Sequence, residues 1–300
     1  MIKRRNFLQY SLLFLAGCTT ASQNSDRNTT HKISNWPTKL HFGISDVQDR
    51  EILERDYATF RMRLEEVLET TIELVPLDNI VAVAPTMLAG ELDLVWAGPS
   101  EYVVLSARAK PVPLVTLKRP GYRTVIVVPQ ESDIQSLADL QGKTLDIWKT
   151  GSTSHLGTAA LFAEKNLQIQ SDLKLVHLDP QAQLANLQAG KIDAFARGYT
   201  SYLTMLEKAG LSEDEQTRII ASTPEWPGDI FVASNQLDPE IVTEMRSRLL
   251  VGQKQLVEAI LAIEDLSTRF EGASMEVAED SDYDYMRQAY KAIGQESLIQ

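Results

Sequence analysis

Three consecutive hydroxyl residues, Ser152, Thr153 and Ser154, follow Gly151 where a predicted strand over residues 144–147 gives way to a predicted helix. A helix start offers free backbone N–H groups and the positive end of the helix dipole. The hydroxyl groups add hydrogen-bond donors, and a glycine allows a bound group to approach the backbone closely. The pattern therefore indicates an anion-binding loop. The same residues would also serve as an ordinary helix cap without a ligand.

His155, directly after Ser154, suggests a second chemistry, in which an imidazole base activates a nucleophilic serine. Such a serine needs the base within hydrogen-bond reach and an acid that orients it. Neighbouring residues at a helix start usually point in different directions, and the chain lacks the Gly-x-Ser-x-Gly turn of many hydrolases. We therefore expect no enzymatic activity and keep His155 as a candidate ligand contact.

The elements that must position these residues alternate along the chain. Apolar runs predict strands over residues 40–44, 72–75, 92–96, 123–128, 144–147, 174–177, 192–196 and 230–233. Helical spacing predicts helices over residues 49–68, 156–165 and 240–263, among others. This alternation predicts an α/β fold, and the length of 300 residues favours two lobes, each a mostly parallel sheet flanked by helices and joined by hinge strands.

Ligands of open α/β sheets bind beyond the carboxyl ends of the strands. The loops expected there supply the candidate site residues, which all bear polar side chains. Besides residues 152–155, they contain Asp46, Ser100, Gln181, Arg197 and Tyr199.

The N-terminus has the form of an export signal, with basic residues at positions 3–5 and an apolar run over 12–16. Residues 15–18 resemble a bacterial lipobox, which implies cleavage before Cys18 and lipidation of its thiol. Residues 4–8 also resemble a twin-arginine signal, and the choice between this route and ordinary secretion stays open. We thus expect a protein anchored on the periplasmic or extracellular side of the membrane.

These signals give a predicted division of the chain. Residues 1–17 are the signal peptide, 18–37 a flexible polar tether, 38–122 with 229–300 the first lobe, and 123–228 the second lobe.

Charge and composition exclude several classes of function. The net charge is −12, and loss of three basic residues with the signal peptide takes it to −15. Such acidity argues against nucleic-acid binding, but a buried anion site depends on local dipoles instead. One cysteine and four scattered histidines form no metal-binding pattern, so we expect neither metal nor cofactor.

Over about residues 38–290 the chain resembles the phosphate/phosphite/phosphonate (PhnD-type) family of ABC-transporter solute-binding lipoproteins. The matching motifs, in family order, lie at residues 91–93, 98–102, 122–128, 136–144, 151–154, 237–240 and 282–287. The resemblance implies a type II periplasmic-binding fold that closes on its ligand about a hinge. It also implies a membrane permease and an ATPase as partners. We expect the protein itself to be a monomer.

The resemblance assigns the oxygens of a tetrahedral phosphorus anion to Ser152, Thr153 and Ser154. It also matches Tyr102, beside Ser100, to a first-lobe tyrosine that reaches the ligand. A tyrosine of the hydrophobic core is the alternative interpretation of Tyr102.

The chain departs from the family where aminophosphonate binders carry acidic residues. Gln181 and Tyr199 stand at those two positions, so a ligand ammonium group would lack a counter-charge. Arg197 could instead bind the anion bidentately, through two N–H donors of its guanidinium group. Arg123, from the hinge strand, could do the same. We expect phosphate, phosphite or a simple phosphonate as ligand. A sulfonate or carboxylate, or a role as the ligand-sensing subunit of a membrane sensor, remain the alternatives.

Overall fold

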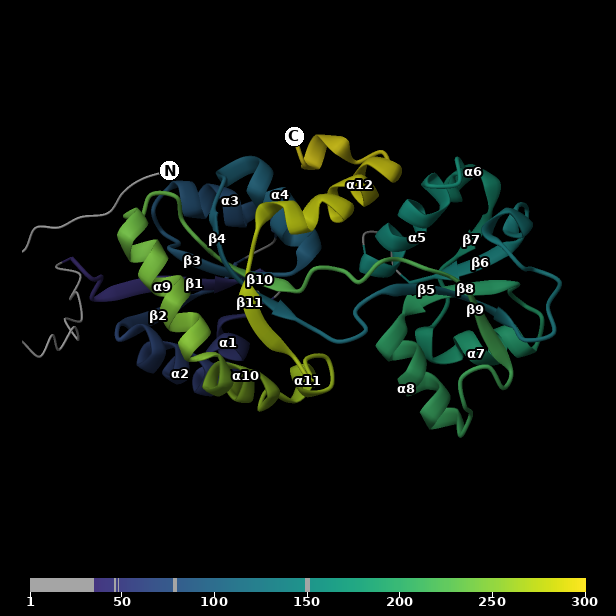
Figure 1. The fold of residues 1–300 in the computed structure, drawn as a ribbon, viewed down its shortest axis with the longest axis horizontal. Helices are drawn as coiled ribbons and strands as arrows, with labels where there is room; N and C mark the ends of the chain where they lie inside the picture. Colours follow the sequence, from purple (N-terminus) through teal and green to yellow (C-terminus); the bar gives the residue numbers. More distant parts are fainter. Residues whose placement is uncertain (1–34, 46, 48, 78–79, 149–151) are drawn as a thin grey trace, which may run out of the picture. The chain divides into compact units, whose positions relative to one another are not determined.

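The computed structural model describes residues 35–300 except 46, 48, 78–79 and 149–151. These residues form two β-sheets, each with helices packed against it (Figure 1). We call each sheet with its helices a lobe. Among the described residues, no helix combines the length and apolar character needed to span a membrane.

The sheet of lobe 1 has six strands in the order β11-β4-β10-β3-β1-β2. The strands are β1 (Lys39–Ile44), β2 (Thr71–Val75), β3 (Leu94–Ala97), β4 (Val112–Lys118), β10 (Asp229–Ala233) and β11 (Ser274–Val277). β1 runs parallel to β2 and β3, whereas β10 and β11 pair antiparallel with their neighbours.

The sheet of lobe 2 has five strands in the order β7-β6-β8-β5-β9. The strands are β5 (Thr124–Pro129), β6 (Thr144–Ile147), β7 (Lys174–Val176), β8 (Ala194–Gly198) and β9 (Thr217–Ser222). β6 is parallel to β7 and β8, while β5 is antiparallel to β8 and β9.

Both sheets are therefore mixed, and the expectation of mostly parallel sheets is wrong in this detail. Each antiparallel pair includes a strand next to a crossover between the lobes. β4 leads out of lobe 1 into β5, and β9 leads back into β10.

Twelve α-helices are present in the described part of the chain. They are α1 (Arg50–Asp56), α2 (Ala58–Leu68), α3 (Ile80–Leu88), α4 (Pro99–Ala109), α5 (Thr153–Ala163), α6 (Ile169–Asp172), α7 (Gln183–Gln188), α8 (Tyr199–Ala209), α9 (Pro239–Val251), α10 (Gln253–Leu261), α11 (Glu264–Ser267) and α12 (Asp284–Ala292). Short 3₁₀ helices cover Leu137–Leu140, Pro180–Ala182, Asp280–Tyr283 and Glu296–Leu298.

Two helices expected to be continuous are each broken once. The helix predicted over 49–68 divides into α1 and α2 at Tyr57, whose buried ring packs edge-on against Trp96. The helix predicted over 240–263 divides at Gly252, where a Cβ atom would lie 2.5 Å from a methyl group of Val67. In both places the break allows the chain to pack closely against another residue of lobe 1.

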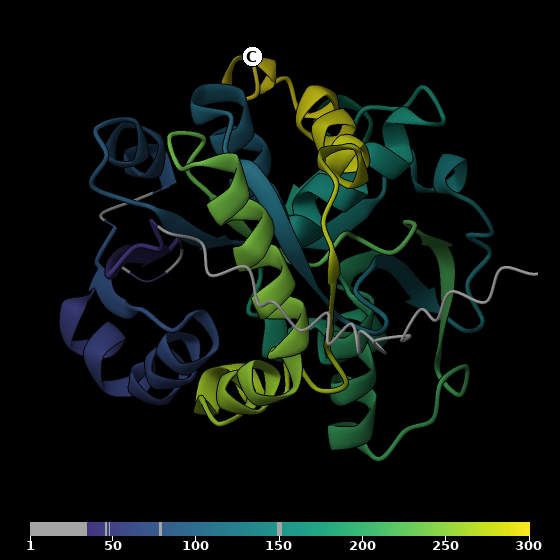
Figure 2. The same cartoon turned by 60° about the vertical axis from the view of Figure 1, so that its left-hand side comes forward.

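Part of the core of lobe 1 is an aromatic cluster on one face of the sheet. Phe42, Phe60, Trp96 and Phe231 pack with ring centroids between 5.4 and 6.1 Å apart. The light-green helix α9 lies against β4 and β11 of the same sheet (Figure 2).

The last long helix, α12, packs against α4 of lobe 1 and α5 of lobe 2. Met286 and Ala289 of α12 share one hydrophobic cluster with Val103 of α4 and Leu156 and Ala160 of α5. Tyr285 adds a hydrogen bond from its hydroxyl to Glu164 at 3.0 Å. Helix α5, which begins at the hydroxyl residues 152–154, is thus held by α12 from the C-terminal part of the chain.

Candidate functional site

The hydroxyl residues 152–154 lie at the start of α5, as the sequence predicted. Ser152 is the N-cap, and its Oγ accepts a hydrogen bond of 3.2 Å from the backbone N–H of His155. A serine hydroxyl that accepts one hydrogen bond can still donate its proton. Ser152, Thr153 and Ser154 are all partly exposed, so they remain accessible to a ligand.

Close packing on the hinge strand fixes the first turns of α5. Gly157 approaches so closely that a Cβ atom would lie 2.4 Å from Thr124 Oγ1 and 2.8 Å from a ring carbon of Trp226. Thr124 Oγ1 donates to the carbonyl oxygen of Thr153 at 3.3 Å and accepts from the Trp226 indole at 3.2 Å. The absence of a side chain at Gly157 is therefore what lets α5 place its hydroxyl groups beside β5.

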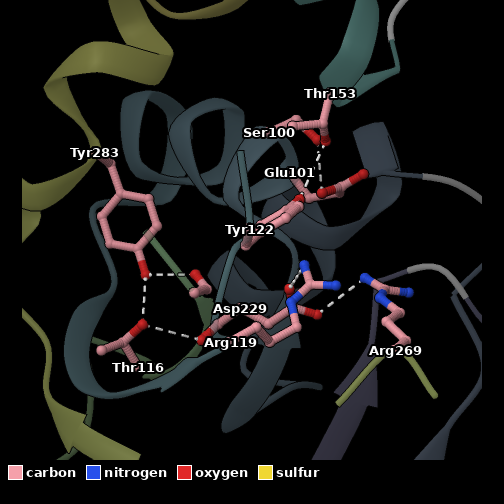
Figure 3. Close-up of polar contacts among 10 residues, drawn as sticks. Ser100, Glu101, Thr116, Arg119, Tyr122, Thr153, Asp229, Arg269 and Tyr283 are labelled. Carbon is pink, nitrogen blue, oxygen red and sulfur yellow. Dashed lines mark hydrogen bonds and ion pairs between the residues drawn. The ribbon is translucent and has the colours of Figure 1, made fainter. Parts of the chain in front are cut away.

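Tyr122 connects the start of α5 to lobe 1. Its hydroxyl lies 3.2 Å from Thr153 Oγ1, and the guanidinium group of Arg119 lies 3.6 Å from the centre of its ring (Figure 3). Enclosure raises the pKa of the Tyr122 hydroxyl, and the nearby Arg119 partly opposes this shift. Tyr122 is therefore a neutral phenol that can donate a hydrogen bond.

Arg119 and Arg269 share the carboxylate of Asp229. Arg119 Nη2 donates to Asp229 Oδ1 at 2.8 Å, and Arg269 Nη2 donates to Oδ2 at 3.1 Å (Figure 3). Asp229 stands at the first position of β10, directly after Gly228. A Cβ atom on that glycine would lie 2.1 Å from the Leu117 carbonyl oxygen, so the close contact of β10 with β4 requires glycine there.

Ser100 and Glu101 lie at the start of α4, whose N-cap is Gly98. Ser100 Oγ donates to Glu101 Oε2 at 2.8 Å, and that carboxylate folds back against Gly98. A carboxylate near a helix N-terminus is stabilised by the helix dipole. Glu101 thus places a negatively charged group beside Ser100, one of the predicted site residues.

Tyr102 is fully buried and points into the core of lobe 1. Its hydroxyl donates to Asp280 Oδ1 at 2.6 Å, and its ring packs edge-on against Tyr283 at 4.5 Å. Burial raises the pKa of Tyr102, and the hydrogen bond to Asp280 adds to the rise. This geometry is that of the core tyrosine considered as the alternative, and a ligand contact would require the bond to Asp280 to break.

Arg197 makes contacts within lobe 2. Its Nη1 donates to the Pro180 carbonyl oxygen and to Gln183 Oε1, both at 2.8 Å. Burial lowers the pKa of Arg197, and the negative charge of Asp146 opposes that shift. Gln181 is exposed on the same short turn, so the structure brings these two predicted site residues to one place.

Arg123 and Tyr199 form a second pair in lobe 2. The Arg123 guanidinium lies 4.0 Å from the centre of the Tyr199 ring, and the Tyr199 hydroxyl donates to Glu213 at 3.2 Å. Both side chains therefore already have partners within their own lobe.

His155 is buried in the first turn of α5. Burial lowers its pKa, and the neighbouring His177 lowers it further. At neutral pH its imidazole is therefore uncharged and adds no cation to the site.

Several expectations fall outside the described residues, namely the signal peptide over 1–17, the lipidation of Cys18, most of the tether over 18–37, and the roles of Asp46 and Gly151. In the part of the chain that the structure covers, no group of three or more histidine, cysteine or acidic side chains could hold a metal ion.

The family model for ABC-transporter, phosphonate, periplasmic substrate-binding proteins matches residues 42–283 of this chain. The chain belongs to that family. Its members bind substrates for transport, and the family places the protein outside the cytoplasm.

Individual relatives agree with this placement. The chain is 24% identical over 249 residues to the phosphate-import protein PhnD of Mycolicibacterium smegmatis, and the match covers 76% of each chain. The fold is similar to PhnD1 of Prochlorococcus marinus in complex with methylphosphonate, at a TM-score of 0.56 and 18% identity, covering 86% of this chain and 99% of that one.

A third similar fold is XAC2383 of Xanthomonas citri bound to ATP, at a TM-score of 0.63 and 16% identity, covering 88% of this chain and 100% of that one. These likenesses confirm the predicted type II periplasmic-binding architecture.

The sequence reasoning missed Arg119, Asp229 and Arg269, and it gave Tyr122 no role. Two local signals were available. Arg119 and Tyr122 flank the Pro-Gly turn at one crossover between the lobes, and Asp229 follows the Pro-Gly turn at the other.

Proposed function

We propose that this member of the phosphonate-binding family captures a small phosphorus oxyanion that lacks an ammonium group, such as phosphate, phosphite or methylphosphonate. One observation carries the proposal. The accessible hydroxyl groups at the start of α5 are fixed by Gly157 and Thr124, and one of them meets the Tyr122 hydroxyl from the hinge. Fixed donors at a helix N-terminus suit a tetrahedral anion.

The proposal that the ligand has no ammonium group is supported by the second lobe. By the family resemblance, Gln181 and Tyr199 stand where aminophosphonate binders carry acidic residues, and the carboxylate of Glu213 already accepts a hydrogen bond from Tyr199. 2-Aminoethylphosphonate should therefore bind less tightly than methylphosphonate.

Titration calorimetry on the purified protein tests this proposal with phosphate, phosphite, methylphosphonate, 2-aminoethylphosphonate and methanesulfonate. The double variant Ser152→Ala/Thr153→Val should weaken binding of the preferred phosphorus anion at least tenfold, because hydrogen bonds to charged groups contribute ~1.5–3 kcal/mol each. Ser136→Ala is the matched control, since Ser136 caps a 3₁₀ helix of the same lobe in a comparable way.

Unchanged affinity in the double variant would place the site elsewhere. Tightest binding of 2-aminoethylphosphonate would refute the assignment of the ligand class, and tightest binding of methanesulfonate would favour a sulfonate carrier.

The cellular setting completes the proposal. The protein works as a monomer, attached outside the cytoplasm by a lipid on Cys18, and delivers its ligand to a membrane permease driven by an ATPase. Cys18→Ala should shift the protein from the membrane fraction to the soluble fraction of cells, and an unchanged distribution would count against lipidation. An adjacent histidine kinase gene, without permease and ATPase genes, would favour a sensing subunit.

A further inference from the structure

Two large apolar side chains are exposed where strands β6 and β7 of lobe 2 end. Trp148 follows β6 directly and is 51% exposed, and Leu178 follows β7 after one residue and is 37% exposed. Most large apolar side chains of the described residues are instead buried in the core of a lobe. Small-molecule sites are typically lined by apolar and aromatic side chains around a few polar groups, so the position of these two relative to the hydroxyl residues matters.

The two strand ends are held side by side. β6 and β7 are parallel neighbours in the sheet of lobe 2 (Figure 1). The backbone N–H of Leu178 donates to Asp146 Oδ1 at 3.0 Å. His177 Nδ1 lies 2.8 Å from the Trp148 carbonyl oxygen and 2.9 Å from that of Ile147, and it donates to both because carbonyl groups only accept. Trp148 and Leu178 therefore lie at neighbouring places on the carboxyl edge of this sheet.

The hydroxyl residues 152–154 belong to the same edge. α5 begins at Thr153, and Ser152 comes four positions after Trp148, so the Cα atoms of Ser152 and Trp148 are at most about 14 Å apart. The carboxyl edge is also where open α/β sheets bind their ligands. A phosphorus anion held by the hydroxyl groups therefore lies at the edge of lobe 2 that carries the two apolar side chains.

The two carboxylates beside these side chains have backbone partners. Asp146, which accepts from Leu178, is fully buried. Asp179 caps the short turn Pro180–Ala182, where its Oδ1 accepts from the backbone N–H of Gln181 at 2.9 Å. Both carboxylates thus serve the backbone at the strand ends, and we assign the ligand contact to Trp148 and Leu178, which we call the apolar patch.

We propose that the apolar patch receives the carbon substituent of an organophosphonate whose phosphonate group is held by the hydroxyl residues of α5. This proposal rests on the proposed function and narrows its ligand class to phosphonates with an apolar substituent of two or more carbon atoms. Phosphate and phosphite have no such substituent and gain nothing from an exposed indole ring. A CH₂ group that moves from water onto the ring adds to the affinity through the hydrophobic effect.

The test is calorimetry with phosphate, methylphosphonate, propylphosphonate and 2-aminoethylphosphonate. The last two ligands are nearly the same size and differ in a terminal methyl or ammonium group. The wild type should bind propylphosphonate about five- to fifteenfold more tightly than methylphosphonate, because each fully buried CH₂ group contributes about fourfold. We call this ratio the chain-length gain.

Substitutions in the apolar patch should reduce the chain-length gain. Trp148→Ala should remove most of it and Leu178→Ala part of it, whereas Trp148→Phe keeps an aromatic ring and should retain part. Leu203→Ala is the matched control, because Leu203 is 36% exposed, nearly the same as Leu178, but lies one turn into α8. This control should keep the full chain-length gain.

A wild type that binds methylphosphonate without a chain-length gain would overturn this inference and leave the proposed function standing. A gain that stays unchanged in both Trp148→Ala and Leu178→Ala, or that falls equally in Leu203→Ala, would overturn it as well. Tighter binding of 2-aminoethylphosphonate than of propylphosphonate would also overturn it and would point to Asp179 as the partner of the ammonium group. A wild type that binds no phosphorus oxyanion would refute the proposed function, and this inference with it.

Discussion

Replacing Asp229 by asparagine tests the buried charges of lobe 1 directly. Asp229→Asn nearly preserves the size of the side chain but removes the carboxylate that Arg119 and Arg269 share. Removal of one partner from a buried ion pair costs about 3–5 kcal/mol, because the remaining charge stays out of water without compensation. Arg119 is buried but Arg269 is 37% exposed, so we expect the lower end, about 3 kcal/mol.

For a protein of this size each kcal/mol lowers the melting temperature by about 2 °C, so the variant should melt roughly 6 °C below the wild type. Phosphate at a hundred times its dissociation constant adds ~2.7 kcal/mol to the free energy of unfolding of both proteins, so the difference between them should remain.

The assay is thermal unfolding of wild type and variant with and without added phosphate. Asp193→Asn is the matched control, because this partly buried carboxylate accepts a hydrogen bond from the Thr144 backbone and forms no ion pair with an arginine in the described part of the chain. An unchanged melting temperature in Asp229→Asn would refute the reasoning about the buried ion pairs of Asp229.

Two further predictions concern packing and acid stability. Gly157→Ala should destabilise the fold by about 1–3 kcal/mol through overpacking against Thr124, only partly offset by ~1 kcal/mol of helix propensity, and should weaken ligand binding. Urea unfolding measures the loss of stability, and calorimetry measures the loss of affinity. The control Gly198→Ala should be tolerated, because its Cβ would meet only a Ser201 hydroxyl at 3.9 Å. Burial acts to raise the pKa of Asp280, but hydrogen bonds from Tyr102 and a neighbouring arginine outweigh it and lower the pKa below its usual 3.8. The Asp280 carboxylate therefore stabilises the fold above about pH 4 and loses this effect as the pH falls through its lowered pKa. The free energy of unfolding of Asp280→Asn should be lower than that of the wild type near neutral pH and should fall less as the pH is lowered. An equal dependence of this free energy on pH in wild type and variant would contradict the prediction.

Strands with a strong apolar run could be predicted from the sequence, and strands with few buried residues could not. β6 matches its predicted range of 144–147, and its last three residues are buried. β11 has only four residues, and of its two apolar residues, Met275 and Val277, only Met275 is buried, so the run is too short to be recognised as a strand. The antiparallel insertion of β10 depends on which neighbours it meets, and no local pattern encodes that choice.

The helix breaks show the same limit. The spacing of apolar residues around Tyr57 and Gly252 continues through both breaks, because both flanking helices face the same core. What interrupts them is close packing, of Tyr57 on Trp96 and of Gly252 on Val67. These contacts join residues far apart in the sequence.

The candidate site divides in the same way. The start of α5 could be predicted, because Gly151 to Ser154 form one local pattern. The Arg119–Asp229 and Asp229–Arg269 contacts join residues 110 and 40 positions apart in the sequence, so no local motif predicts them. Tyr102 meets Asp280 across 178 residues, which is why the sequence alone left its core and ligand roles open.

We expect the hydroxyl groups at the start of α5 to hold the phosphorus oxyanion. A crystal structure of the wild-type protein grown with methylphosphonate tests it most directly. Phosphonate oxygens should lie within about 2.7–3.2 Å of the hydroxyl groups of Ser152, Thr153 or Ser154. A phosphonate bound only by Arg197, Arg123 or other groups of lobe 2, away from the start of α5, would contradict it.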